Sequence, residues 1–160
     1  MSELTPTTDD NKPKATEARK GLPVRTQARR AALQALYQWV INPSSVVEIE
    51  QQFLTDASIQ LGSKPFFSNL LTGVLANLDT IDATIVTALD RPMSQLNPVE
   101  LSTLRLGVWE LSQMPETPYR VIINEAVELA KAFGAEGGHA YVNGVLDKLA
   151  QTLRPEEAKL

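Results

Sequence analysis

Apolar residues recur along most of this chain at the spacing of one face of an α-helix. The first such stripe follows Arg25, and its positions fall at i, i+4, i+7, i+8 and i+11, which matches a 3.6-residue period. The pair Asn42-Pro43 predicts the end of this helix, because a proline cannot continue the helical hydrogen bonds. The stripe consists of Ala28, Ala32, Ala35, Leu36 and Trp39.

Two further helices are predicted before Pro92. A short one is expected over about Ser45–Ala57, and Gly62 separates it from the next. Ser63 can cap the second helix, whose apolar face continues without a break for about six turns to Asp90.

The second half of the chain carries three more helical segments. Asn97-Pro98 and Thr117-Pro118 each place a cap residue before a proline suited to the first helical position. Gly134 is expected to end the helix after Pro118 in a left-handed conformation, and a last helix is predicted over about Glu136–Leu153. Since no segment alternates with period two, the sequence predicts an all-α fold of six or seven helices.

Length and composition predict one domain with polar ends. The 160 residues can bury a core, and the absence of cysteine excludes disulfides, thiolate zinc sites and a cysteine nucleophile. Residues 1–22 are expected to be a disordered polar and basic tail, residues 23–154 the helical domain, and residues 155–160 a short C-terminal tail. No signal peptide or membrane-spanning run is found, so a cytoplasmic location is expected.

The chain is acidic as a whole, but one segment near its N-terminus is strongly basic. The net charge of -4 and the pI of about 5.0 argue against a nucleic-acid partner. Residues 11–30, however, hold seven basic side chains against the single acid Glu17. One end of an acidic protein can therefore attract a polyanion. The basic residues are Lys12, Lys14, Arg19, Lys20, Arg25, Arg29 and Arg30.

The sequence offers no catalytic machinery, and we expect no enzymatic activity, cofactor or metal. His139 is the only histidine, and no nucleophile motif accompanies it. Glu125 and Glu128 lie three residues apart on one helical side, where a solvated face is the simpler interpretation than an acid/base or metal pair.

The arginine-rich start of the first helix is the strongest candidate for binding. Arg25, Arg29 and Arg30 can pair with phosphates, and Tyr37 lies two turns after Arg30 on the same side of the helix. An exposed aromatic ring beside arginines can stack on an unpaired base. From the residues alone, a merely solubilising helix start with Tyr37 at the core edge is an equally open interpretation.

Three stretches resemble the NusB family. They are ARRAALQALYQW (Ala28–Trp39), NPVELSTLRLGVWEL (Asn97–Leu111) and VIINEAVELAKAFGAEGGHAYVNGVLDKLA (Val121–Ala150). Together they span about Arg25 to Arg154 in the order typical of the family. The resemblance implies a compact fold of about seven helices in two small bundles.

The resemblance also implies a function in transcription antitermination. Family members bind the single-stranded boxA element of ribosomal RNA transcripts together with the ribosomal protein NusE. With other Nus factors they help RNA polymerase to resist termination. The resemblance assigns RNA binding to Arg25, Arg29, Arg30, Tyr37, His139 and Tyr141. It assigns the NusE surface to Glu100.

Several positions depart from the family pattern. Thr26 and Gln27 stand where the family often has arginine, and Gly137, Gly138 and Ala140 replace polar or charged residues. These changes predict weaker RNA affinity, which the basic tail could restore. Two alternatives remain: a purely protein-binding helical module, and a NusB-like accessory domain related to ribosomal RNA methyltransferases.

Overall fold

All regular elements within residues 21–158, which the computed structural model describes, are helical. The predicted all-α class is thereby confirmed, with eight α-helices and one 3-10 turn in this part of the chain. The α-helices are α3 (Val24–Ile41), α4 (Val46–Thr55), α5 (Lys64–Ala76), α6 (Leu78–Val86), α7 (Pro98–Gln113), α8 (Tyr119–Phe133), α9 (Gly138–Leu153) and α10 (Pro155–Ala158), and η1 is Met93–Gln95. The predicted tail lies outside the described residues, except for Gly21 and Leu22.

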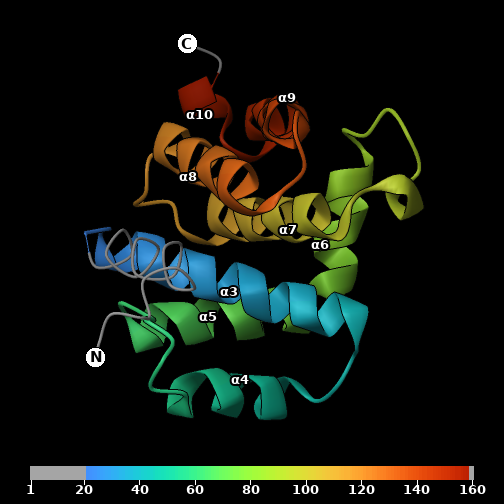
Figure 1. Ribbon diagram of the computed structural model, residues 1–160. Helices are drawn as coiled ribbons and strands as arrows, with labels where there is room; N and C mark the ends of the chain where they lie inside the picture. The colour runs from blue at the N-terminus through green and yellow to red at the C-terminus, as the bar shows by residue number, and fades with distance from the viewer. Residues whose placement is uncertain (1–20, 159–160) are drawn as a thin grey trace.

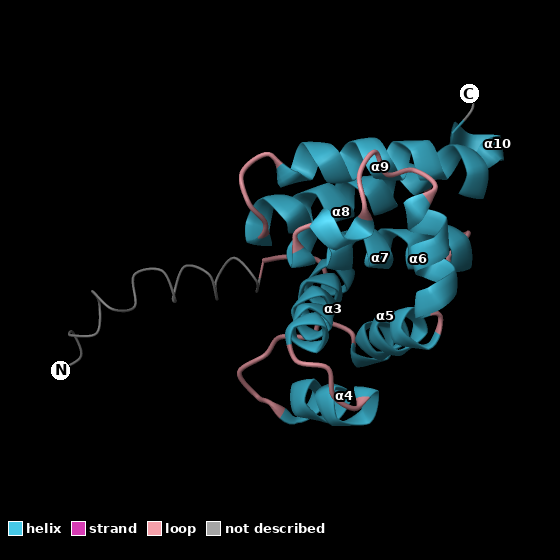
Figure 2. Cartoon of the chain, turned by 90° about the vertical axis from the view of Figure 1, so that its right-hand side faces the viewer, coloured by secondary structure: helices cyan, strands magenta, loops and turns pink. Residues whose placement is uncertain are grey.

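Helix α3 lies at the centre of two groups of helices (Figures 1 and 2). On one side it packs against α5 and α4, and on the other against α7 and α8, while α9 covers α7 and α8. The predicted apolar stripe explains this position, because Ala28, Ala32, Ala35 and Leu36 are all buried. Their small side chains allow close approach from two sides.

The predicted helix from Ser63 to Asp90 is wrong in one respect, because it breaks into α5 and α6 at Asn77. The Asn77 side chain donates a hydrogen bond to the carbonyl of Gly73 at 2.8 Å. Its backbone N–H is shared between the carbonyls of Gly73 and Val74 at 3.2 Å each. Asparagine competes in this way with regular helical bonding. Figure 1 shows α6 turning sharply away from α5.

Two predicted helix boundaries also differ from the structure. Thr117 does not cap α8. The helix begins at Tyr119, its N-cap residue is Pro118, and it has no side-chain cap hydrogen bond. The backbone N–H of Tyr119 instead donates to the Glu157 carboxylate at 3.2 Å. Gly134 ends α8 in an extended conformation, with φ -95° and ψ 180°, rather than the left-handed one. The left-handed residue is Gly137, directly before α9, at φ 86°.

Residues 155–158 of the predicted C-terminal tail form α10 and join the helical domain. The preceding residue, Arg154, is buried and donates hydrogen bonds to the carbonyls of Leu111 and Met114 at 2.7 Å each. These carbonyls belong to the end of α7, where the helix itself provides no donors. Arg154 also contacts the Glu157 carboxylate at 2.5 Å. The turn after α9 therefore holds the C-terminal end of α7 close to the N-terminal start of α8.

A glycine is required where α5 meets α7. A Cβ atom built at Gly73 would overlap the indole ring of Trp109, whose Nε1 donates to Asn69 at 3.1 Å. At Gly144, in α9, a Cβ atom would meet nothing within 4 Å. The two helical glycines therefore differ in the space around them rather than in backbone conformation.

We expect Gly73→Ala to destabilise the protein by about 1–3 kcal/mol, because the indole ring must move from its packed position. The matched change Gly144→Ala should stabilise it by about 0.5–1 kcal/mol through helix propensity. Urea unfolding followed by circular dichroism measures both. Equal effects of the two substitutions would contradict the close packing of α5 on α7.

Candidate nucleic-acid interface

The three arginines at the start of α3 point in different directions. Arg25 is exposed, and its guanidinium lies 4.3 Å from the centre of the Phe66 ring, on the α5 side of the helix. Arg30 is half-buried on the α8 side, with its guanidinium 4.9 Å from the centre of the Phe133 ring. These stacked arrangements hold each guanidinium flat on an aromatic face.

Arg29 is only 4% exposed and forms a buried ion pair. Its Nε and Nη2 donate to the two carboxylate oxygens of Glu110 at 2.8 Å each, and Nη1 lies 3.4 Å from Glu125. Burial by itself would lower the pKa of Arg29, but the hydrogen bonds and charges of the two carboxylates raise it above its ordinary value. This geometry places Arg29 in the packing between helices rather than on the surface where RNA was expected to meet it.

Glu125 has a different environment from the one expected. It accepts a hydrogen bond from the Thr26 hydroxyl at 3.0 Å in addition to its contact with Arg29. Glu128 fits the simpler interpretation, being exposed and 3.6 Å from Lys131 one turn away. Glu125 is therefore a structural link between α8 and α3.

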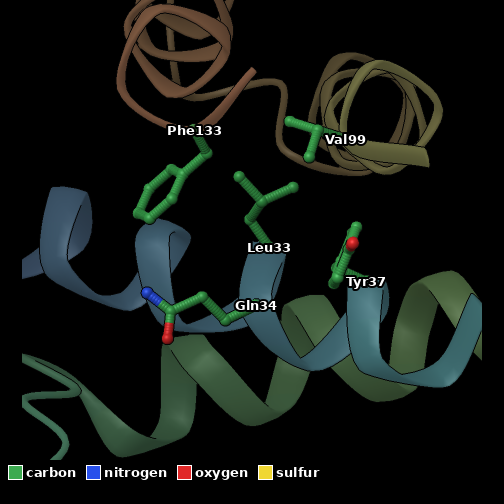
Figure 3. Close-up of a pocket in the computed structure, with 5 residues that line it drawn as sticks. All are labelled: Leu33, Gln34, Tyr37, Val99 and Phe133. Atoms are coloured by element: carbon green, nitrogen blue, oxygen red, sulfur yellow. The ribbon is translucent and has the colours of Figure 1, made fainter. Parts of the chain in front are cut away.

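Tyr37 lines an open groove at the junction of α3, α7 and α8 (Figure 3). The ring is 41% exposed, and the groove encloses about 230 Å³. Phe133 from α8 and Val99 from α7 form its other walls, with Leu33 and Gln34 along α3. Because the Arg30 guanidinium lies over the Phe133 ring, Arg30 adjoins one wall of this groove.

Glu100 and His139 lie where α7 and α9 both begin. Glu100 is half-buried, and its carboxylate covers Gly138 so closely that a Cβ atom there would lie 2.5 Å from Oε2. A carboxylate at this point suits the positive end of the α9 dipole. His139 is half-buried on the first turn of α9. Since Val99 lines the Tyr37 groove, the first turn of α7 links that groove to the start of α9.

Tyr141 belongs to a cluster with the loop between α6 and α7. Its hydroxyl donates to Asp90 at 3.2 Å, and the Arg91 guanidinium lies 4.3 Å from the centre of its ring. Arg91 in turn donates to Asp90 at 2.9 Å. Burial and the Asp90 carboxylate raise the pKa of Tyr141, while the hydrogen bond from Arg91 lowers that of Asp90. The tyrosine therefore remains the donor and the aspartate the acceptor.

The structure brings together some of the predicted site residues and separates others. Arg30 and Tyr37 both adjoin Phe133, whereas Arg25 faces α5 and Glu100 lies against Gly138 at the start of α9. Sequence reasoning missed Phe133 and Arg91, which carry no motif of their own and gain their roles only through contacts with residues distant in the chain.

Within residues 21–158, no group of three or more histidine, cysteine, aspartate or glutamate side chains is arranged to hold a metal ion. None of the helices described is both long and apolar enough to cross a membrane.

Comparison with known sequences gives a consistent family match. Residues 26–151 match the model of the NusB family. The transcription antitermination protein NusB of Marinomonas sp. (strain MWYL1) is 50% identical over 163 residues, which cover 98% of this chain and 92% of that protein. NusB of Pseudomonas fluorescens is also 50% identical, over 84% of this chain and 81% of its own length.

Solved structures show the same fold. T. maritima NusB superposes with a TM-score of 0.74 at 30% identity and covers 84% of this chain and 96% of its own. A NusB solved in complex with NusE and double-stranded RNA gives a TM-score of 0.68 at 25% identity, covering 81% of this chain and 97% of its own.

The buried ion pair makes Glu110 a sensitive position. Glu110→Leu removes the bidentate partner of Arg29 and should cost about 3–5 kcal/mol, because a guanidinium is left in the core with incomplete pairing. The double variant Arg29→Met/Glu110→Leu should recover most of that loss. Arg120→Ala, which removes an exposed arginine 3.5 Å from Asp147, should change stability by no more than about 0.5 kcal/mol.

Urea unfolding of the four proteins tests this expectation. If Glu110→Leu unfolds at the same urea concentration as the unaltered protein, the ion pair does not hold α3 against α7.

Proposed function

This chain belongs to the NusB family, and on that basis we propose that it is a transcription antitermination factor that binds boxA RNA of ribosomal RNA transcripts together with the ribosomal protein NusE. The relatives that match it carry the name transcription antitermination protein, and one family structure holds both NusE and RNA. With other Nus factors, the complex helps RNA polymerase to resist termination. The protein acts in the cytoplasm and works through binding rather than catalysis.

The observation that supports RNA binding most strongly is the surface shared by Arg30, Phe133 and Tyr37. The Arg30 guanidinium lies over the Phe133 ring, and Phe133 in turn lines the apolar groove that contains the partly exposed Tyr37. Arginine neutralises phosphates, and exposed rings stack on unpaired bases, so one surface offers both interactions that a single strand needs.

The proposed roles follow the exposure of each residue. Arg25 and Arg30 meet phosphates, and Tyr37 and Tyr141 stack on bases. Arg29, which is buried, contributes indirectly by fixing the helix that carries its neighbours. Glu100 lies against Gly138, the residue before His139, so RNA and NusE could both be contacted at the start of α9.

The form of the RNA is part of the proposal. The related complex contains double-stranded RNA, whereas a groove lined by Tyr37 and Phe133 suits a base that is free to leave its stack. A duplex presents its bases already stacked, so its recognition relies on backbone contacts. We therefore assign this surface to single-stranded boxA.

The length of the relatives bears on the methyltransferase alternative. This chain covers 92% and 81% of two relatives named as antitermination proteins, so the match extends over nearly a whole protein of that kind. An accessory domain would be expected to match a short part of a longer enzyme. This observation favours the antitermination function.

Fluorescence anisotropy with labelled boxA RNA tests the function. We expect boxA single strands to bind more tightly than a scrambled strand or a duplex, and NusE to increase that preference. Raising the salt concentration should weaken binding with a slope of about 0.7 per phosphate contact. If none of the RNAs binds with or without NusE, while NusE itself binds, the purely protein-binding module replaces the present proposal.

Substitutions at two positions of α3 separate stacking from charge. Tyr37→Ala should weaken boxA binding by about 5- to 100-fold, whereas Tyr37→Phe keeps the ring and should bind nearly as well as the unaltered protein. Arg25→Ala should reduce the salt slope by about 0.7.

Arg120→Ala is the matched control for charge, because Arg120 is an exposed arginine thirteen residues before Phe133, about 20 Å away along α8. Equal losses from Arg25→Ala and Arg120→Ala would show that net charge alone accounts for binding.

A further inference from the structure

The cluster of Asp90, Arg91 and Tyr141 contacts an exposed guanidinium from two sides. Asp90 accepts hydrogen bonds from both partners, from Arg91 at 2.9 Å and from the Tyr141 hydroxyl at 3.2 Å. The inner face of the Arg91 guanidinium lies over the tyrosine ring at 4.3 Å. The Arg91 side chain is still 44% exposed. A preorganised arginine loses less conformational freedom when it binds a ligand.

A groove of about 180 Å³ lies beside this cluster, between the α6–α7 loop and α9. Asp90 and Tyr141 form one side of it, and Lys148 lies two turns further along α9. Gly144 lines the groove from the same helix, and the direction in which its Cβ would point is open for 4 Å. The groove therefore combines an aromatic wall, an open floor and two nearby cations.

Lys148 supplies the positive charge that this groove offers to an anion, and it is exposed. Arg91 is paired with Asp90 and is also influenced by the Glu100 carboxylate, so it contributes a stacking surface more than a free positive charge. The Lys148 ammonium can pair with a phosphate, and the Arg91 guanidinium can stack on a base, which a lysine cannot do.

We propose that this groove is a second nucleotide site, in which Arg91 stacks on one base of single-stranded RNA while Lys148 pairs with a neighbouring phosphate. The proposal rests on the function given above and adds Arg91 and Lys148 to its RNA-contacting residues. Asp90 is a positioning residue, since it contacts Arg91 and Tyr141 rather than the RNA. The strand thus extends past the start of α9 to the loop between α6 and α7.

A chemically similar cluster at the start of α8 provides the control. Arg120 lies 4.9 Å from the Tyr119 ring and 3.5 Å from Asp147, so it has the same three types of side chain as the proposed site. It is also exposed. Loss of Arg120 removes the same charge and the same kind of stacking from the protein.

Binding of boxA RNA to the complex with NusE, measured by anisotropy at several salt concentrations, tests the proposal. Arg91→Ala should weaken binding by about 5- to 100-fold and leave the salt slope nearly unchanged, because Arg91 stacks on a base rather than pairing with a phosphate. Lys148→Ala should reduce the salt slope by about 0.7, while Arg120→Ala changes neither the affinity nor the slope. Arg91→Lys keeps the charge without the planar stacking face, so it should weaken binding as Arg91→Ala does.

A second variant tests the groove without touching the cluster. Gly144→Leu places a larger side chain at an exposed position whose Cβ meets nothing within 4 Å, and it should weaken RNA binding while the protein stays folded. Gly144→Ala is its control and should bind as the unaltered protein does. Thermal unfolding of each variant confirms that the fold is kept.

The outcomes separate this proposal from the one on which it rests. If Arg25→Ala and Tyr37→Ala weaken binding but Arg91→Ala and Gly144→Leu do not, the second site is wrong and the antitermination function stands. If the unaltered protein binds no RNA, both fail. If Arg91→Ala weakens NusE binding in the absence of RNA, the cluster is a protein contact and the second site is overturned.

Discussion

The buried ion pair of Arg29 with Glu110 and Glu125 is the interaction on which the arrangement of helices depends. Each of its three members comes from a different helix, so one guanidinium fixes α3 against both α7 and α8. Removing these charges from water is costly and is offset only by complete pairing in good geometry. The bidentate contacts meet that condition and define a single position of α3 along its neighbours.

Helix α3 is consequently both a core element and part of the surface. Its alanine stripe is buried from two sides, while Arg25, Arg30 and Tyr37 emerge at its edges. Arg25 contacts Phe66 of α5, and Arg30 contacts Phe133 of α8. Tyr37 lines the groove that Phe133 also lines. The proposed binding surface is therefore rigid, since its side chains project from a helix that is packed against other helices on both sides.

Sequence reasoning succeeded where a signal is local and failed where it depends on contacts. The cap at Ser63 and the pair Asn97-Pro98 lie within one turn of the helices they begin, and both appear in the structure as predicted. The break at Asn77 was missed, because the apolar face of α5 and α6 continues across it. Arg29 and Arg30 are adjacent residues of the same type, so the sequence does not distinguish them. Glu110 of α7 pairs with Arg29 in the core, whereas Arg30 lies over the Phe133 ring of α8.

The contacts of Arg154 have a consequence for the order in which the protein forms. This residue follows every helix whose ends it joins, and it binds the final carbonyls of α7 while Glu157 receives the first amide of α8. During synthesis, α7 and α8 leave the ribosome before the side chains that complete their ends. The helices can pair early, but their ends are secured only after α9 has been translated. The junction between α7 and α8 is therefore completed only late in translation.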